Sequence, residues 1–279
     1  MIFARHIPAP PLSQFVQQFW YYAGLDVPHQ RERVLPDGTF HLIVNLSEEP
    51  RTLFDRERTG RSRDFRRAWV SGAHREYLVI DARPGTSLIG IHFKPGGAAP
   101  FLGLPAVELR DRVVELEEVM SSVVSGLRDA LLEASDPRDK FCLLERFLLG
   151  RAGGSPRWAP AVAHALRRFQ AVPHTATIAS VARELGLSHK HFIARFQAEV
   201  GLSPKRYCRL RRFQQVLAQI GRKSAVDWAD LACACGYYDQ AHFIQEFHAF
   251  SGLKPTAYLR QRGEYLGFVP LEESSSPTG

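Results

Sequence analysis

Basic side chains dominate the segment between Val200 and Val226, which contains no Asp or Glu. Its apolar residues recur at helical spacing, which predicts one long helix over residues 204–222. A solvated helix face usually carries acids as well as bases, whereas a face of one sign suits the phosphates of a nucleic acid. We therefore predict phosphate contacts for Lys205, Arg206, Arg209, Arg211, Arg212, Arg222 and Lys223.

The charge of the whole chain is unevenly distributed. Its 279 residues include 36 Lys and Arg and 29 Asp and Glu, a net charge of +7. Residues 155–279 hold 16 basic and 9 acidic residues, so they account for the whole excess. This asymmetry favours a polyanion, most commonly a nucleic acid, as partner of the C-terminal half.

The cysteines and the apolar runs exclude several classes of protein. No apolar run is long enough to span a membrane, and the N-terminus lacks the pattern of a secretory signal. The four cysteines include no C-x-x-C pair and are too few for a disulfide framework in a chain of this length. We therefore expect a reducing cytoplasm, with no membrane partner.

An internal repeat is the most specific signal in the chain. Residues 191–211 and 242–262 are identical at eleven of 21 positions at an offset of 51. Upstream of these segments the offset becomes 50, so the second copy has gained one residue in its turn. The C-terminal half therefore contains two copies of one helical unit.

Each copy has the pattern of a helix-turn-helix. In the first, a helix over residues 177–185 ends at Gly186, and Ser188 is a suitable N-cap for a second helix over residues 189–200. The second copy repeats this with helices over residues 227–235 and 240–250 and with Asp239 as N-cap. The second helix of such a unit lies in the major groove of DNA, with its N-terminal residues at the base edges. The outward positions predicted to read bases are His189, Lys190, Ile193, Ala194 and Gln197, and then Gln240, Ala241, Ile244 and Gln245.

The repeat resembles the DNA-binding domain of the AraC/XylS family of bacterial transcription regulators over residues 158–262. The run from Gly236 to Phe243 is very similar to the signature of the family's second unit. The resemblance implies two helix-turn-helix subdomains joined by a long helix, and sequence-specific promoter binding. The other residues that carry it are Ala182, Gly186, Leu187, Ser188, Phe192, Phe196, Gly201, Ser203, Pro204, Ile244, Phe247, Gly252, Pro255 and Tyr258.

Two departures from the family pattern affect the predicted base contacts. Glu246 stands where the family often has Arg, which removes a charged helper from the second unit. Ile193 and Ala194 replace polar or Arg side chains of the family, and they are suited to thymine methyl groups rather than to hydrogen bonds. Gln240 and Gln245 could bond adenine edges.

The N-terminal half consists mainly of short predicted strands, and it resembles, more loosely, the cupin-like sensor domains of some family members. The resemblance rests on Leu35–Gly38, His41–Leu46 and Gly90–Gly97, and it implies effector binding or dimerisation. His41 and His92 lack the H-x-H spacing of a metal-binding cupin, so we interpret them as structural histidines, with ligand or metal contacts as the alternative. We predict no metal, no cofactor and no catalytic residue.

The predicted fold class is α+β multidomain. An N-terminal antiparallel β sandwich or barrel occupies residues 1–150, with a solvated loop over residues 51–67. Helices over residues 107–116, 116–131 and 138–149 close it. A linker over residues 151–157 precedes the all-α DNA-binding domain at residues 158–265, and residues 266–279 form a tail whose polar end is expected to be disordered.

We predict a sequence-specific transcription regulator that places two recognition helices in successive major-groove segments of double-stranded promoter DNA. RNA polymerase, a small-molecule effector and a second copy of the chain are further candidate partners. An enzyme whose first domain performs metal chemistry, and an architectural protein that binds DNA without sequence preference, are the alternatives.

Overall fold

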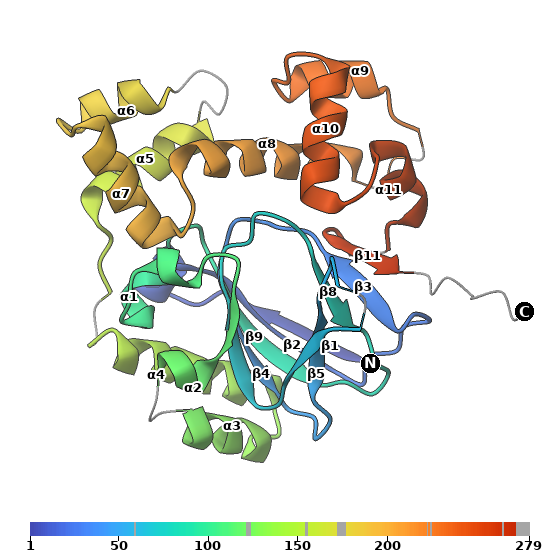
Figure 1. Cartoon of the computed structure of the whole chain (residues 1–279). Coiled ribbons are helices and arrows are strands. Elements are labelled where there is room, and N and C mark those ends of the chain that lie inside the picture. Colours follow the sequence, from blue (N-terminus) through green and yellow to red (C-terminus); the bar gives the residue numbers. More distant parts are fainter. Residues whose placement is uncertain are drawn as a thin grey trace, which may run out of the picture.

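The computed structural model of the chain describes residues 1–58, 60–120, 124–153, 156–171, 177–221, 223, 225–263 and 265–271. A β-rich N-terminal half carries a helical C-terminal half along one side (Figure 1). Within these residues, no helix combines the length and the apolar character that a membrane span requires.

Two antiparallel sheets form the centre of the N-terminal half, as the sequence predicts. The first has the order β1-β2-β9-β4-β7-β10 and the second the order β11-β3-β8-β5-β6. The first sheet contains β1 (Ile2–His6), β2 (Val16–Ala23), β9 (Leu88–Phe93), β4 (His41–Asn45), β7 (Ala68–Ser71) and β10 (Val113–Glu115). The second contains β11 (Phe268–Leu271), β3 (Arg31–Val34), β8 (Leu78–Asp81), β5 (Arg51–Phe54) and β6 (Ser62–Phe65).

Apolar residues on both faces of the first sheet explain its central place. Side chains alternate between the two faces of a strand, so Leu42 and Val44 face one core and Ile43 faces another. Ile43 joins a small cluster with Trp69 and with Phe65 of the second sheet, between the two sheets. The opposite face packs against helices and belongs to the main core of the molecule.

Short helical segments cover that opposite face (Figure 1). Asp136 caps the longest of them, since its side chain accepts a hydrogen bond from the backbone N–H of Arg138. The ring of Phe141 in this helix stacks on Phe19 of β2 with centroids 6.3 Å apart. The segments are η1 (Leu12–Gln14), α1 (Ala99–Leu102), η2 (Ala106–Leu109), α2 (Leu116–Val119), α3 (Val124–Glu133) and α4 (Pro137–Arg151).

The C-terminal half contains the two predicted helix-turn-helix units. The predicted caps are confirmed: Ser188 and Asp239 accept hydrogen bonds from the backbone N–H groups of His191 and His242. Gly186 and Gly236 have φ of 66° and 72°, the left-handed conformation that suits glycine after a helix. The helices are α5 (Pro160–Ala171), α6 (Ile178–Glu184), α7 (His189–Val200), α8 (Pro204–Ile220), α9 (Trp228–Ala234), α10 (Gln240–Ser251) and α11 (Pro255–Gln261).

The long helix α8 belongs to both units. Near its start, Tyr207 packs on Phe196 of α7, and nearer its end Phe213 packs on Phe247 of α10, at centroid distances of 5.7 and 5.3 Å. The aromatic stripes of α7 and α10 therefore meet different parts of one helix. The two units are thus joined through one shared helix.

The two halves share one continuous core. Trp158, just before α5, stacks on Phe15 of the N-terminal half with ring centroids 5.0 Å apart. The hydrophobic cluster that includes Phe15 extends without a break to Phe213 and Phe247. The helical half is thus docked firmly on the β-rich half.

Three expectations from the sequence are wrong. Residues 51–67 were predicted to form a solvated loop, but they contain β5 and β6. The charged residue Arg51 obscured the strand pattern in the sequence; in the structure it is buried and paired with Asp81 (Nη2–Oδ1, 3.3 Å). The segment 107–116 contains η2 and β10 instead of one helix.

The third error concerns the predicted tail over residues 266–279. Its residues 268–271 form β11, which pairs with β3, and Val269 is fully buried there. Without β11, β3 would be an edge strand with unpaired backbone groups, so this pairing satisfies them. The polar end of the predicted tail, residues 272–279, lies outside the described residues.

Candidate nucleic-acid interface

The N-terminal ends of α7 and α10 face solvent. His189 and Lys190 in α7, and Gln240 and Ala241 in α10, are exposed. Further along, Ala194 and Gln245 are exposed, while Ile193, Gln197 and Ile244 are half-buried. The structure thus leaves the predicted base-reading positions accessible at the start of each second helix, and their contacts with bases remain a prediction.

The C-terminal ends of the same helices are held by the N-terminal half. Gly201, which ends α7, lies so close to Phe40 that a Cβ there would stand 3.1 Å from the ring. Gly252, its counterpart after α10, would bring a Cβ within 2.5 Å of the Tyr77 ring. The backbone N–H of Tyr77 also donates to the carbonyl oxygen of Phe250 at 3.1 Å. The β-rich half therefore contacts equivalent points of both copies.

The basic residues of α8 (Pro204–Ile220) and of the segment after it differ in exposure and in their contacts. Lys205 and Lys223 are exposed, and Arg211 is half-buried. Arg206 donates a hydrogen bond to the carbonyl oxygen of Arg75 at 3.2 Å and lies over the Phe250 ring. Arg222 lies outside the described residues.

Glu246 of α10 engages two of the predicted phosphate contacts. Its side chain is only 6% exposed, and its Oε1 lies 2.5 Å from Nε of Arg209. Its Oε2 lies 3.5 Å from Nη2 of Arg212, and His242 approaches within 3.4 Å. The face predicted to carry one sign of charge therefore receives a carboxylate from the second copy. Whether Arg209 and Arg212 also contact phosphate stays a prediction.

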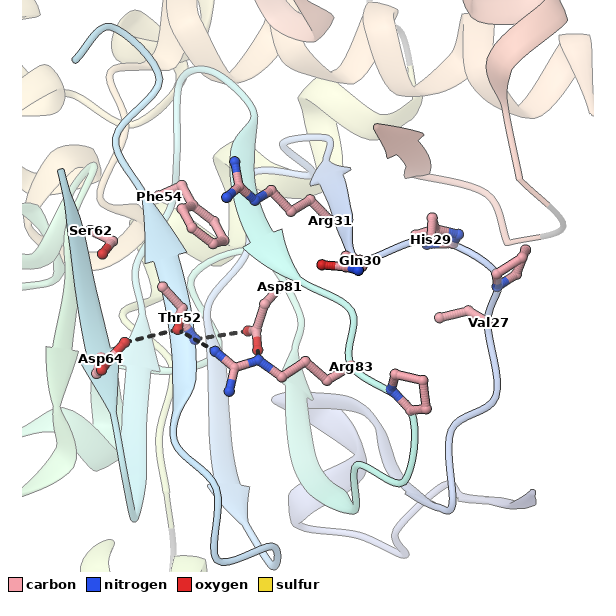
Figure 2. A pocket seen from close by; sticks show the side chains of 12 residues that line it. Val27, His29, Gln30, Arg31, Thr52, Phe54, Ser62, Asp64, Asp81 and Arg83 are labelled. Atoms are coloured by element: carbon pink, nitrogen blue, oxygen red, sulfur yellow. Dashed lines mark hydrogen bonds and ion pairs between the residues drawn. The ribbon is translucent and has the colours of Figure 1, made fainter. Parts of the chain in front are cut away.

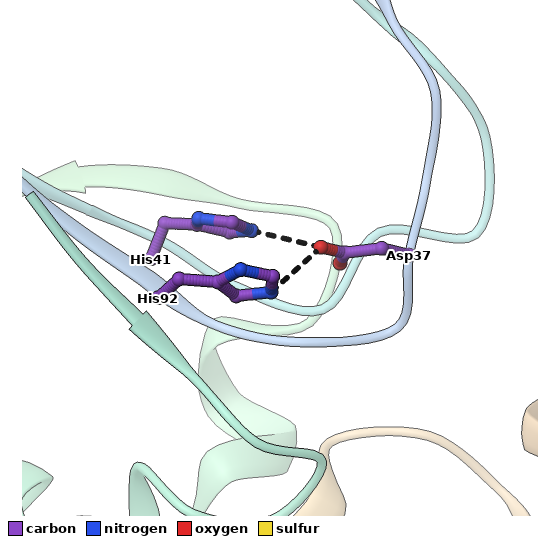
Figure 3. Close-up of side chains that lie close together, drawn as sticks. All are labelled: Asp37, His41 and His92. Atoms are coloured by element: carbon purple, nitrogen blue, oxygen red, sulfur yellow. Dashed lines mark hydrogen bonds and ion pairs between the residues drawn. The ribbon is translucent and has the colours of Figure 1, made fainter. Parts of the chain in front are cut away.

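Asp37, His41 and His92 converge at the domain boundary (Figure 3). His41 on β4 and His92 on β9 are direct cross-strand partners, and their rings stack at 4.4 Å. Asp37 Oδ2 lies 3.0 Å from Nε2 of His41 and 3.1 Å from Nε2 of His92. No sequence pattern places the two histidines together, because only strand pairing shows that positions 51 residues apart are neighbours.

The electrostatics of this cluster favour a charged carboxylate on Asp37. Burial would raise the pKa of Asp37, but the charges and hydrogen bonds of His41 and His92 outweigh it and hold that pKa well below its usual value. Burial, together with the neighbouring His41, lowers the pKa of His92. Nearby, burial lowers the pKa of His74 to about 4.

A polar hollow of about 630 Å³ lies over β3, β8, β5 and β6 (Figure 2). Its charged side chains mostly satisfy one another. Asp81 accepts a hydrogen bond from the backbone N–H of Thr52 at 2.7 Å and pairs with Nε of Arg83 at 3.0 Å. Thr52 in turn donates to Asp64 at 2.8 Å. We assign no ligand to this hollow.

Two family models match parts of the chain. A family model described as a helix-turn-helix domain matches residues 181–261, and one described as a domain of unknown function (DUF6597) matches residues 4–115. No curated protein matches.

Two solved structures illustrate the range of structural similarity. ToxT from Vibrio cholerae is 10% identical at a TM-score of 0.45, covering 92% of this chain and 98% of that one. The C-terminal domain of AraT, a response regulator from Geobacillus stearothermophilus, is 22% identical at a TM-score of 0.35, covering 43% of this chain and 95% of that one. Both TM-scores are too low to carry a conclusion.

The helix-turn-helix match begins within α6 and continues into α11, so both α7 and α10 lie inside it. The caps, the turn glycines and the aromatic stripes of these units follow the pattern expected of the AraC/XylS DNA-binding domain. The C-terminal half therefore contains a DNA-binding helix-turn-helix domain of the AraC type, the kind found in transcription regulators.

Proposed function

We propose that the protein recognises promoter DNA by placing the N-terminal halves of α7 and α10 in two successive major-groove segments. One observation carries this proposal: both helices are held at their C-terminal ends by the same domain and are exposed at their N-terminal ends. Base contacts of a helix-turn-helix come from the N-terminal residues of its second helix, which are the free ends here.

The N-terminal half, in this proposal, controls how the two reading helices are spaced. It contacts Gly201 through Phe40 and Gly252 through Tyr77, so a shift between these two contact points would change the spacing of the helices. Successive major-groove segments on one face of a duplex are about 34 Å apart, so binding both requires a defined spacing. An effector or a second copy of the chain that altered this half would thereby alter DNA affinity.

Selection from random duplexes, followed by footprinting of the enriched sites, tests the proposal. We expect two preferred half-sites about 10–10.5 base pairs apart and protection on one face of the duplex. One preferred half-site alone would contradict simultaneous reading by α7 and α10. A preference below about 10³-fold over random DNA would instead favour an architectural protein.

A further inference from the structure

We propose that Asp37, His41 and His92 bind a divalent transition-metal ion of the zinc or ferrous type. The three side chains offer one carboxylate oxygen and two imidazole nitrogens, and these donor atoms all lie within 4.8 Å of one another. Two strands and one turn bring them together: β4 carries His41, β9 carries His92, and Asp37 precedes β4 (Figure 3).

The distances suit a common ion. Bonds of about 2.0–2.2 Å from zinc to imidazole nitrogen or carboxylate oxygen place neighbouring ligands roughly 3.0–3.5 Å apart. Asp37 Oδ2 already lies 3.0 and 3.1 Å from the two Nε2 atoms. An ion could therefore replace the hydrogen bonds between these atoms with small side-chain movements.

Thr39 holds the carboxylate in this orientation. Both its hydroxyl and its backbone N–H donate to Asp37 Oδ1, at 2.7 and 2.9 Å. Oδ1 is thus occupied, and Oδ2 is directed at the two imidazoles. A hydrogen-bonded partner that orients a ligating carboxylate is a regular feature of protein metal sites.

The donor set indicates the chemical class of the ion. Imidazole nitrogen suits zinc and iron, whereas magnesium and calcium prefer sites built from oxygen alone. Two histidines and one carboxylate leave coordination positions open for water or another ligand. The side chains of Asp37, His41 and His92 remain 31%, 28% and 24% exposed, so solvent can reach these positions.

The site lies where the β-rich half touches α8. The carbonyl oxygen of Pro36, next to Asp37, accepts a hydrogen bond from Gln214 of α8 at 2.6 Å. Gly38, on the other side, approaches Leu210 so closely that a Cβ would stand 2.9 Å from it. Phe40 continues this strip to the end of α7. Metal binding at Asp37 would restrain the same backbone that holds the DNA-binding half, so we expect metal and DNA affinities to be coupled reciprocally.

Cobalt titration of the full-length, metal-stripped protein tests the site. We expect one Co²⁺ per chain, d–d absorption without a cysteine thiolate charge-transfer band, and displacement by Zn²⁺. His41→Ala and His92→Ala should each abolish this binding. His29→Gln is the matched control, because His29 also pairs with a carboxylate of the same half, that of Glu32, outside the cluster. Failure of the native chain to retain Co²⁺, a thiolate band, or equal binding by His92→Ala would overturn the proposal.

A second variant keeps the test decisive if the histidine variants do not fold. Thr39→Val preserves shape but removes the hydroxyl that orients Asp37, and we expect it to weaken Co²⁺ binding by about 10-fold or more. Zn²⁺ should also raise the melting temperature of the native chain, since an ion that binds only the folded state stabilises it. Unchanged affinity in folded Thr39→Val together with no Zn²⁺-dependent rise in Tm would refute the site.

DNA affinity measured with and without Zn²⁺ tests the coupling separately. We expect the affinity of the native chain to change with Zn²⁺, and Gln214→Ala to reduce that change while retaining Co²⁺. Metal binding with an unaltered DNA affinity would refute the coupling and leave the metal site standing.

Discussion

The two helix-turn-helix copies have the same backbone arrangement, but their second helices, α7 and α10, carry different charges at equivalent positions. Position 195 of the first copy corresponds to position 246 of the second at the repeat offset of 51. Arg195 is exposed on α7, whereas Glu246 is buried on α10 and binds Arg209 and Arg212 of α8. The first copy therefore adds the positive charge of Arg195 to the surface, whereas Glu246 of the second copy neutralises the charges of Arg209 and Arg212.

Acid–base pairs in the first copy lie at its surface instead. Glu184 of α6 pairs with Arg168 and His164 of α5 at 3.0 and 2.9 Å, with all three side chains at least about one-third exposed. Exposed pairs contribute little to stability because water screens them, whereas removal of one partner from a buried pair costs about 3–5 kcal/mol. A duplicated unit can therefore keep its caps and aromatic stripe and still change where its charge is available.

The largest expected effect concerns the glycines at the ends of the reading helices. Gly252→Ala should lower the free energy of unfolding by about 3 kcal/mol, because left-handed φ and an overpacked Tyr77 both oppose a Cβ. Gly201→Ala should cost less, about 2 kcal/mol, because its Cβ would lie farther from Phe40 than the Cβ at position 252 from Tyr77. Gly186→Ala, with a similar φ of 66° and no atom within 4 Å, isolates the backbone cost at about 1 kcal/mol.

Urea unfolding of the three variants measures these differences. Repeating Gly252→Ala in a Tyr77→Leu background should recover part of the loss, since the clash is then relieved. Equal losses at all three glycines would show that the β-rich half does not press on the helix ends.

The buried carboxylate gives the next largest effect. Glu246→Gln should lower the free energy of unfolding by about 2 kcal/mol, less than for a fully buried pair because Arg209 and Arg212 remain 29% and 21% exposed. Arg195→Gln, the matched change in the first copy, should cost under about 0.5 kcal/mol because its side chain is exposed. Thermal or urea unfolding distinguishes the two, and similar losses would erase the proposed difference between the copies.

The sequence predicted those features that local chemistry determines. Each cap and turn glycine of the two units follows from residues within a few positions, and Ser188, Asp239, Gly186 and Gly236 all stand as expected. The repeat added an internal check, because each copy confirms the other.

Features that depend on long-range partners escaped the sequence. The charge of Arg51 suggests a loop residue, but in the structure its side chain is buried and pairs with Asp81 of another strand. Val269 belongs to a strand only because β3 offers an open edge far away in the chain. Glu246 looked like a lost DNA contact, but its partners Arg209 and Arg212 are provided by the helix between the copies.

Base recognition should also separate the two copies. Lys190→Ala should relax base preference only within the half-site read by α7, and Gln245→Ala only within that read by α10. A well-formed side-chain contact to a base contributes about 1–3 kcal/mol of discrimination. Selection of binding sites by each variant measures this, and each variant serves as the control for the other. Loss of preference across both half-sites in either variant would contradict separate reading.

The smallest effect should come from phosphate contacts, which depend on whether a basic side chain is exposed or already paired with an acid. Lys205 is exposed, whereas Arg209 is bound to Glu246. Loss of one phosphate contact makes the negative slope of log affinity against log salt shallower by about 0.9. Lys205→Ala should therefore reduce the magnitude of the slope by about that amount for every duplex sequence. Arg209→Ala should change the slope less, since its charge is already compensated, while reducing the free energy of unfolding. An equal decrease in the magnitude of the slope for both variants would mean that Arg209 leaves Glu246 for phosphate when DNA binds, so that the second copy also presents its charge to DNA.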